Sequence, residues 1–230
     1  MSDREANLKE KIRQALASTV RVISDDLDIK KKTKEKKNSN KLDFYELNNL
    51  NNKNDFIKAR AETDSLALRK KFSNDKIYKN NLPNNSSCKS LYALAEKIRC
   101  ETLGGKMLKG IKKNFNDNYN QIINLKKKDQ LKIKEDVPVA EAFELYMLKN
   151  FHNIKLNSLT SKMLSFWEKD FDQSINKHIK FLKDNFEDQN IYNSRFSKIL
   201  QDIEIFQTED TQETKEENQE EGQEDQSNDN

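Results

Sequence analysis

The sequence predicts a mainly α-helical protein, and three observations lead to this prediction. Apolar residues recur at helical spacing through most of the 230-residue chain. Glycine and proline, which tight turns between strands need, occur only four times and twice. Hydrophobic residues make up 34% of the chain and charged residues 35%, so the apolar residues suffice for a core mainly because they gather in stripes. We expect an irregular helical domain over residues 1–206 and a disordered acidic tail over residues 207–230.

The first helix is predicted to end near Ser24, after Ser2 and Glu5 at the spacing of a capping box. Residues 26–30 and 42–45 could form two short strands of a small β-hairpin around a Lys- and Asn-rich loop. A helix from Lys53 to Phe72 follows, and then a loop over residues 73–87. The inner stripe of that helix is predicted to comprise Ile57, Ala61, Asp64, Leu68 and Phe72.

The longest helical pattern covers residues 87–115 and changes its apolar face close to Gly104-Gly105. Either the helix breaks there or it buries different faces against different neighbours. We therefore class Gly104, Gly105 and Gly110 as helix-break or packing residues. Further helices are predicted after Asp136, with Pro138 near the first turn, and over residues 158–186 and 191–206.

The charge of the chain is divided unevenly along its length. Residues 207–230 hold ten Asp or Glu and a single lysine, Lys215, so the remaining body carries 41 basic and 29 acidic residues, a net charge of +12. Such a division indicates either an anionic partner or a tail that shields the body. No apolar run approaches the roughly 20 residues of a membrane span. Two cysteines, Cys88 and Cys100, fit a reduced cytoplasm.

Motifs of self-sufficient catalysis are missing from the sequence. Lys106 follows two glycines, but the earlier glycine of a phosphate-binding loop and the Ser or Thr after its lysine are absent. Cys88, Cys100, His152 and His178 match no zinc spacing, so we expect no metal site. His178 lies on an apolar stripe, which favours a buried, hydrogen-bonded role. We therefore expect no catalytic residue and no cofactor bound by this chain.

Asp64 stands in an apolar helical stripe, where an unpaired carboxylate is costly. Arg99 could meet it from the long helix, or Arg60 from one turn earlier on the same helix. Such a pair would hold two helices in register or would form a charged docking point for a partner. We class Arg60, Asp64, Arg99 and Glu101 as candidates for structural ion pairs or partner binding.

Two segments carry a family resemblance. Residues 60–69, RAETDSLALR, and residues 95–110, AEKIRCETLGGKMLKG, resemble the N-terminal region of CobT, a subunit of the aerobic ATP-dependent cobalt chelatase. The likeness continues in Asn114-Phe115 and in residues 137–142, VPVAEA. The first helix and the acidic tail also fall in the expected order.

The resemblance implies a subunit of a complex that inserts cobalt into hydrogenobyrinic acid a,c-diamide during cobalamin biosynthesis. An AAA+ ATPase subunit and a large corrin-binding subunit would be its partners, and ATP, magnesium and cobalt would be used by the complex. The chain would thus belong to a nitrogen–metal bond-forming ligase without being its catalytic subunit. No membrane partner is expected, and a nucleic-acid partner is less favoured than the two protein subunits.

Such subunits normally continue into a von Willebrand A-type domain with an Asp-x-Ser-x-Ser motif, and this motif does not occur here. We expect a fragment, a split gene product or a truncated subunit. The alternative is a basic helical protein that binds RNA or ribosomes. Salt-dependent binding of generic RNA would favour this alternative, whereas co-purification with an AAA+ protein would favour the chelatase.

Overall fold

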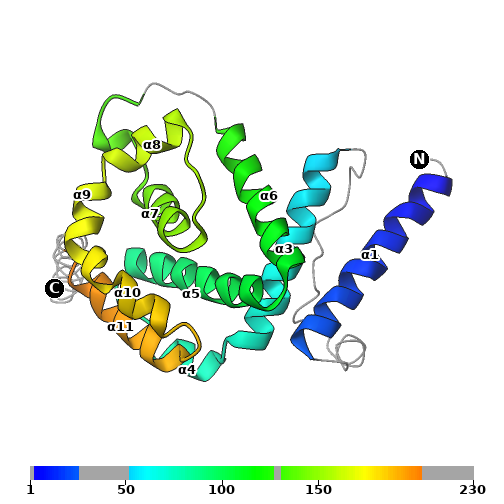
Figure 1. Ribbon diagram of the computed structural model, residues 1–230, viewed down its shortest axis with the longest axis horizontal. Coiled ribbons are helices and arrows are strands. Elements are labelled where there is room, and N and C mark those ends of the chain that lie inside the picture. The colour runs from blue at the N-terminus through cyan, green and yellow to red at the C-terminus, as the bar shows by residue number, and fades with distance from the viewer. Residues whose placement is uncertain (1–2, 26–51, 127–130, 204–230) are drawn as a thin grey trace, which may run out of the picture.

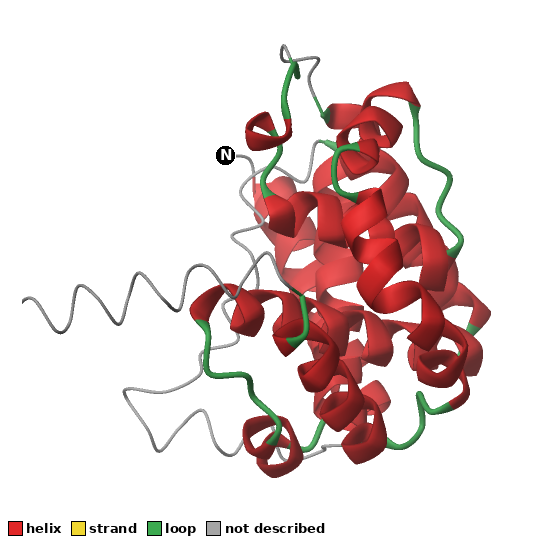
Figure 2. Ribbon diagram, turned by 90° about the vertical axis from the view of Figure 1, so that its left-hand side faces the viewer, coloured by secondary structure: helices red, strands yellow, loops and turns green. Residues whose placement is uncertain are grey.

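The computed structural model describes residues 3–25, 52–126 and 131–203, and within these ranges the ordered elements are helices without a strand (Figures 1 and 2). The mainly α prediction is therefore confirmed. The proposed hairpin at 26–30 and 42–45, the capping residue Ser2 and the tail at 207–230 lie outside the described residues. The helices are α1 (Asp3–Ser24), α3 (Lys53–Phe72), α4 (Asp75–Asn80), α5 (Ser86–Met107), α6 (Lys109–Leu125), α7 (Val139–Met147), α8 (Ser158–Ser165), α9 (Glu168–Phe171), α10 (Lys177–Asp184) and α11 (Gln189–Gln201).

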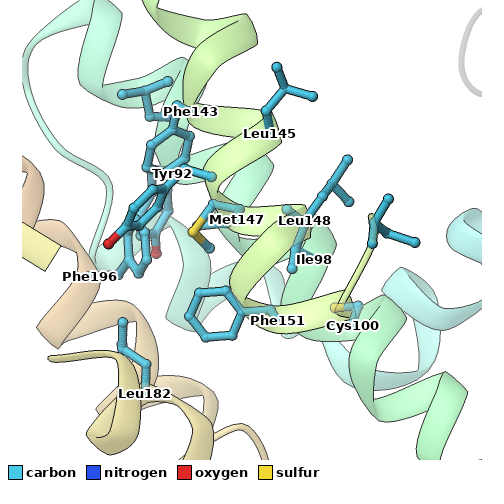
Figure 3. Packing of buried hydrophobic residues seen from close by; sticks show 14 of the residues in the cluster. Tyr92, Ile98, Cys100, Phe143, Leu145, Met147, Leu148, Phe151, Leu182 and Phe196 are labelled. Carbon is cyan, nitrogen blue, oxygen red and sulfur yellow. The ribbon is translucent and has the colours of Figure 1, made fainter. Parts of the chain in front are cut away.

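Helix α5 is the centre of the fold. It packs against α3, α6, α7 and α11, and half of its 22 residues are buried. Side chains of α5, α7, α10 and α11 meet in the main core, where Ile98 and Tyr92 lie near Phe143, Met147 and Phe196 (Figure 3). A helix surrounded in this way has no single apolar face. The change of face near Gly104-Gly105 comes at the end of α5, since Ile111 and Phe115 belong to α6.

Helix α3 lies between α1 and the rest of the body (Figure 1). The predicted stripe of α3 faces inward, with Ala61, Asp64 and Leu68 buried. The opposite side carries Ala59, Thr63 and Ala67, which are also buried. Small residues on this second side allow α1 to pack close to α3, and the sequence pattern had not indicated that contact.

Asparagine, abundant in this chain, begins several of the helices. The side chains of Asn52, Asn74, Asn85 and Asn157 accept hydrogen bonds from the first-turn N–H groups of α3, α4, α5 and α8. Such bonds satisfy donors that the helix itself leaves unpaired. The high asparagine content therefore contributes directly to the helix boundaries.

Several predicted boundaries were wrong. The pattern over residues 87–115 divides into α5 and α6 at Leu108, which has an extended backbone (φ −137°, ψ 118°), and α6 continues to Leu125. The loop at 73–87 contains α4, which buries no residue and therefore leaves no apolar periodicity. Pro138 lies near the first turn of its helix as predicted, since it directly precedes α7.

The predicted helix over residues 158–186 is interrupted twice. The chain turns at Phe166–Trp167, and a turn of π-helix, η3 (Asp172–Asn176), separates α9 from α10. Another π-helical turn, η2 (Leu148–His152), follows α7 and ends at Asn153 in the left-handed conformation, φ 55°. Among the described residues, no helix is both long and apolar enough to cross a membrane.

Candidate functional site

Arg99 is held in a buried network that ties α5 to two distant segments. Its guanidinium donates to both carboxylate oxygens of Glu96, each at 2.8 Å, and both side chains are 1% exposed. It also donates to the backbone carbonyls of Phe186 at 2.8 Å and Phe72 at 2.6 Å. Gln189 donates to the same Glu96 carboxylate at 3.2 Å. The end of α3, the middle of α5 and the start of α11 are therefore joined at one point.

The bonds of Arg99 explain how the fold accommodates a buried charge. Burial opposes the charged form of Arg99, but the hydrogen bond and the negative charge of Glu96 outweigh it and raise the arginine pKa. A buried ion pair is tolerated when its remaining hydrogen-bonding groups are satisfied. The candidate Arg99 is thus part of a structural ion pair, and its partner is Glu96.

Asp64 does not meet Arg99, so the pairing predicted from the sequence was wrong. Its Oδ2 accepts a 2.6 Å hydrogen bond from Nδ2 of Asn114 on α6, and within the described ranges no cation lies within ion-pair distance of it. Burial raises the pKa of Asp64, while Asn114 and the positive charge of Arg60 lower it in part. Arg60 itself lies exposed on α3. The neutral amide of Asn114 therefore satisfies the Asp64 carboxylate, a role that the sequence analysis had assigned to an arginine.

Glu101 lies two residues beyond Arg99 on α5, at the junction of α3, α5 and α6. Its carboxylate accepts hydrogen bonds from Ser65 Oγ at 2.7 Å and from Tyr119 Oη at 2.6 Å. Burial raises the pKa of Glu101, and the charge of Lys97 with these two hydrogen bonds opposes the rise. Asp64 and Glu101 thus place two buried carboxylates at one helix junction, each bonded within the fold.

His152 completes this junction, a position that no sequence pattern indicated. Its ring lies 5.7 Å from the ring of Tyr119 and 6.3 Å from that of Phe115. Its Nε2 is buried without a hydrogen bond, 3.8 Å from Oε2 of Glu101. Burial lowers the pKa of His152 to about 4, with contributions from Lys97 and Lys112. The imidazole is therefore neutral at pH 7. It is brought here by η2, a non-standard turn that apolar spacing does not reveal.

The three candidate glycines have different surroundings. A Cβ on Gly104 would lie 2.3 Å from the buried Leu68 side chain, so this glycine allows α5 to approach α3 closely. A Cβ on Gly105 would lie 3.4 Å from Lys112 at the turn between α5 and α6, and Gly110 faces open space. Gly104 is therefore a packing residue, and the break in the helix occurs at Leu108.

The other residues considered for chemistry do not form a reactive centre. Cys88 and Cys100 are buried cysteines, and burial raises the pKa of the Cys100 thiol. No group of three His, Cys, Asp or Glu side chains that could hold a metal ion occurs among the residues that the structure describes. His178 was expected to be buried and hydrogen-bonded, but it is half-exposed and lines a surface pocket of about 250 Å³.

Comparison with known families gives a match over nearly the whole chain. The family model described as "Cobalamin biosynthesis protein CobT" matches residues 6–230. Neither the curated proteins nor the solved structures give a match. The segments 60–69 and 95–110 that carry the resemblance contain Asp64, Arg99, Glu101 and Gly104, the residues that join α3, α5 and α6. The chain belongs to the CobT family of cobalamin biosynthesis proteins.

Proposed function

We propose that this chain is a non-catalytic subunit of a cobaltochelatase that inserts cobalt into hydrogenobyrinic acid a,c-diamide. Its partners would be an AAA+ ATPase subunit and a large corrin-binding subunit in the cytoplasm. The complex would use ATP, magnesium and cobalt, with none of them bound by this chain. The family match over residues 6–230 carries the proposal.

The buried positions of the charged candidate residues support a non-catalytic role. The candidates Arg99, Asp64 and Glu101 are each 1% exposed and bonded to neighbouring helices. They hold the helices together and are not presented to a substrate. Large apolar residues remain exposed on α1, including Leu8 at 55% and Val22 at 73%, so this helix has surface available for another subunit.

Reconstitution of the complex tests the proposal. The tagged chain should co-elute with the AAA+ subunit, and cobalt insertion, followed by the absorption change of the corrin, should require the chain together with both partners. An unrelated basic helical protein of similar size serves as the control for charge. Full insertion by the two partners alone would refute the role. Binding of generic RNA, weakening steeply with salt, without binding of the ATPase would support the RNA-binding alternative.

A further inference from the structure

Four exposed lysines gather where α5 turns into α6: Lys106, Lys109, Lys112 and Lys113, together called the lysine surface here. Residues 102–116 contain these four lysines and no Asp or Glu. Three of them, at 109, 112 and 113, share one face of α6 by helical spacing. The N-terminal end of the α6 dipole adds positive potential at the same place, and Leu108 provides no side-chain cap.

The nearest carboxylates on α5 do not neutralise this surface. Glu96 and Glu101 are 1% exposed and bonded inward. Asp117 pairs with Lys113 at the edge of the surface, at 2.5 Å. The other three lysines have no ion-pair partner within the described residues. Helix α10 also carries three lysines, Lys177, Lys180 and Lys183, but it ends with a carboxylate, Asp184, beside the last of them. The lysine surface is therefore a concentrated, uncompensated positive patch.

We propose that the chain's own acidic segment, residues 207–230, docks on the lysine surface. This segment holds ten Asp or Glu and one lysine, so its charge complements the patch. It contains no apolar residue, so electrostatic attraction would hold it there without a packed interface. While docked, it would screen the patch from other anionic partners.

The geometry of the body allows the segment to reach the patch. The end of α11 lies beside the start of α5, because Cys88 Sγ lies 3.6 Å from the carbonyl oxygen of Leu200. Helical rise places Met107 about 29 Å from Cys88 along α5, at the end where α6 begins (Figure 1).

A random coil of the 13 to 22 residues that separate Ile203 from residues 216–225 would have a mean end-to-end distance of about 20–26 Å, and repulsion between like charges lengthens such a coil. The mean length of the tether therefore matches the distance to be crossed. Such a match gives an effective concentration on the order of millimolar, so a weak electrostatic contact suffices for docking.

Zero-length crosslinking of the full chain with a carbodiimide, followed by mass spectrometry, tests this proposal. At low salt, carboxylates of 209–229 should link mainly to Lys106, Lys109 and Lys112. These links should fall at least about tenfold in 1 M salt, where the Debye length is about 3 Å. Crosslinks spread evenly over all exposed lysines would overturn the proposal.

Two matched triple variants test whether docking depends on the lysine surface or on positive charge anywhere on the body. Lys106→Gln, Lys109→Gln and Lys112→Gln together should release the acidic segment, measured by energy transfer between dyes placed at Gly222→Cys and Asn120→Cys. Lys177→Gln, Lys180→Gln and Lys183→Gln together, on α10, should leave the transfer unchanged. Equal effects of the two variants would refute the proposal, as would crosslinks found mainly between chains in a mixture of light and isotope-labelled protein. Protection of the lysine surface by RNA but not by the acidic segment would also refute it.

Discussion

At the scale of single residues, the network around Arg99 should dominate stability. Arg99→Ala would leave Glu96 as an uncompensated buried charge and two carbonyls without their donor. The expected cost is about 3–5 kcal/mol in the free energy of unfolding, measured by urea denaturation. Lys113→Ala, which removes an exposed pair with Asp117, should cost less than about 0.5 kcal/mol and serves as the control. A loss below about 1 kcal/mol for Arg99→Ala would contradict this account.

Asp64 should behave differently, because it is not paired with Arg99. Burial raises its pKa, so the charged form destabilises the fold: the favourable contribution is complete below the unfolded pKa near 3.8 and is lost as pH rises through the folded value. Asp64→Asn should therefore be neutral or stabilising at pH 7. Asp64→Ala should cost about 1–3 kcal/mol, since Asn114 then loses its acceptor. The double variant Asp64→Ala with Arg99→Ala should be additive within about 0.5 kcal/mol; a strong coupling energy would contradict the separation seen here.

The lowered pKa of His152 predicts that the free energy of unfolding decreases in acid. Its folded pKa is about 4 against an ordinary 6.5. Between these values the unfolded chain binds a proton that the folded chain does not. The stabilising contribution is thus fully present above pH 6.5 and disappears as pH falls towards 4, by up to about 3 kcal/mol.

The difference between wild type and His152→Gln, followed by denaturation from pH 7.5 to 4, measures this contribution. Wild type should lose stability relative to the variant as pH falls. Glu101 faces the same site and its raised pKa acts in the opposite direction, so the comparison is repeated with Glu101→Gln. Parallel curves for wild type and His152→Gln would show that His152 does not titrate as described.

At the scale of secondary structure, the sequence predicts long helices with a regular apolar stripe well and other elements poorly. The predicted bounds of α3 agree with the structure because its inner stripe is regular and the side chain of Asn52 caps its N-terminus. The junction at His152 could not be predicted, since a π-helical turn changes the spacing on which the pattern depends. Asp64 was recognised as buried, but its partner was not. The choice between Asn114 and Arg99 depends on how α5 and α6 fold about Leu108, which is a tertiary contact.

Glycine substitutions on α5 and α6 test the close approach of α5 to α3. Gly104→Ala should cost about 1–3 kcal/mol, because its Cβ would meet three atoms of Leu68 within 2.9 Å and Leu68 is fully buried. Gly110→Ala, also helical but facing open space, should be neutral or stabilising by up to about 1 kcal/mol. Thermal unfolding distinguishes the two, and equal melting temperatures would show that Leu68 moves aside freely.

At the scale of the whole molecule, the buried charged residues hold the helices together, whereas the exposed residues form the surfaces that other molecules can reach. Arg99, Asp64 and Glu101 join helices that are distant in sequence, so the region carrying the family resemblance corresponds to the framework of the fold. The surface presents exposed apolar residues on α1 and the lysine surface between α5 and α6.

Because the buried charged residues serve to hold the helices together, we predict that the purified chain alone neither hydrolyses ATP nor inserts cobalt into a corrin. The sequence contains no phosphate-binding loop, and the carboxylates that could assist proton transfer are bonded inside the helical framework. Steady-state ATP turnover should stay at the buffer background through successive purification steps, and the corrin spectrum should not change with added cobalt. Addition of the AAA+ and corrin-binding subunits should restore both activities. Turnover that co-purifies quantitatively with the chain, and that disappears when the chain is thermally unfolded, would place a catalytic site in this subunit after all.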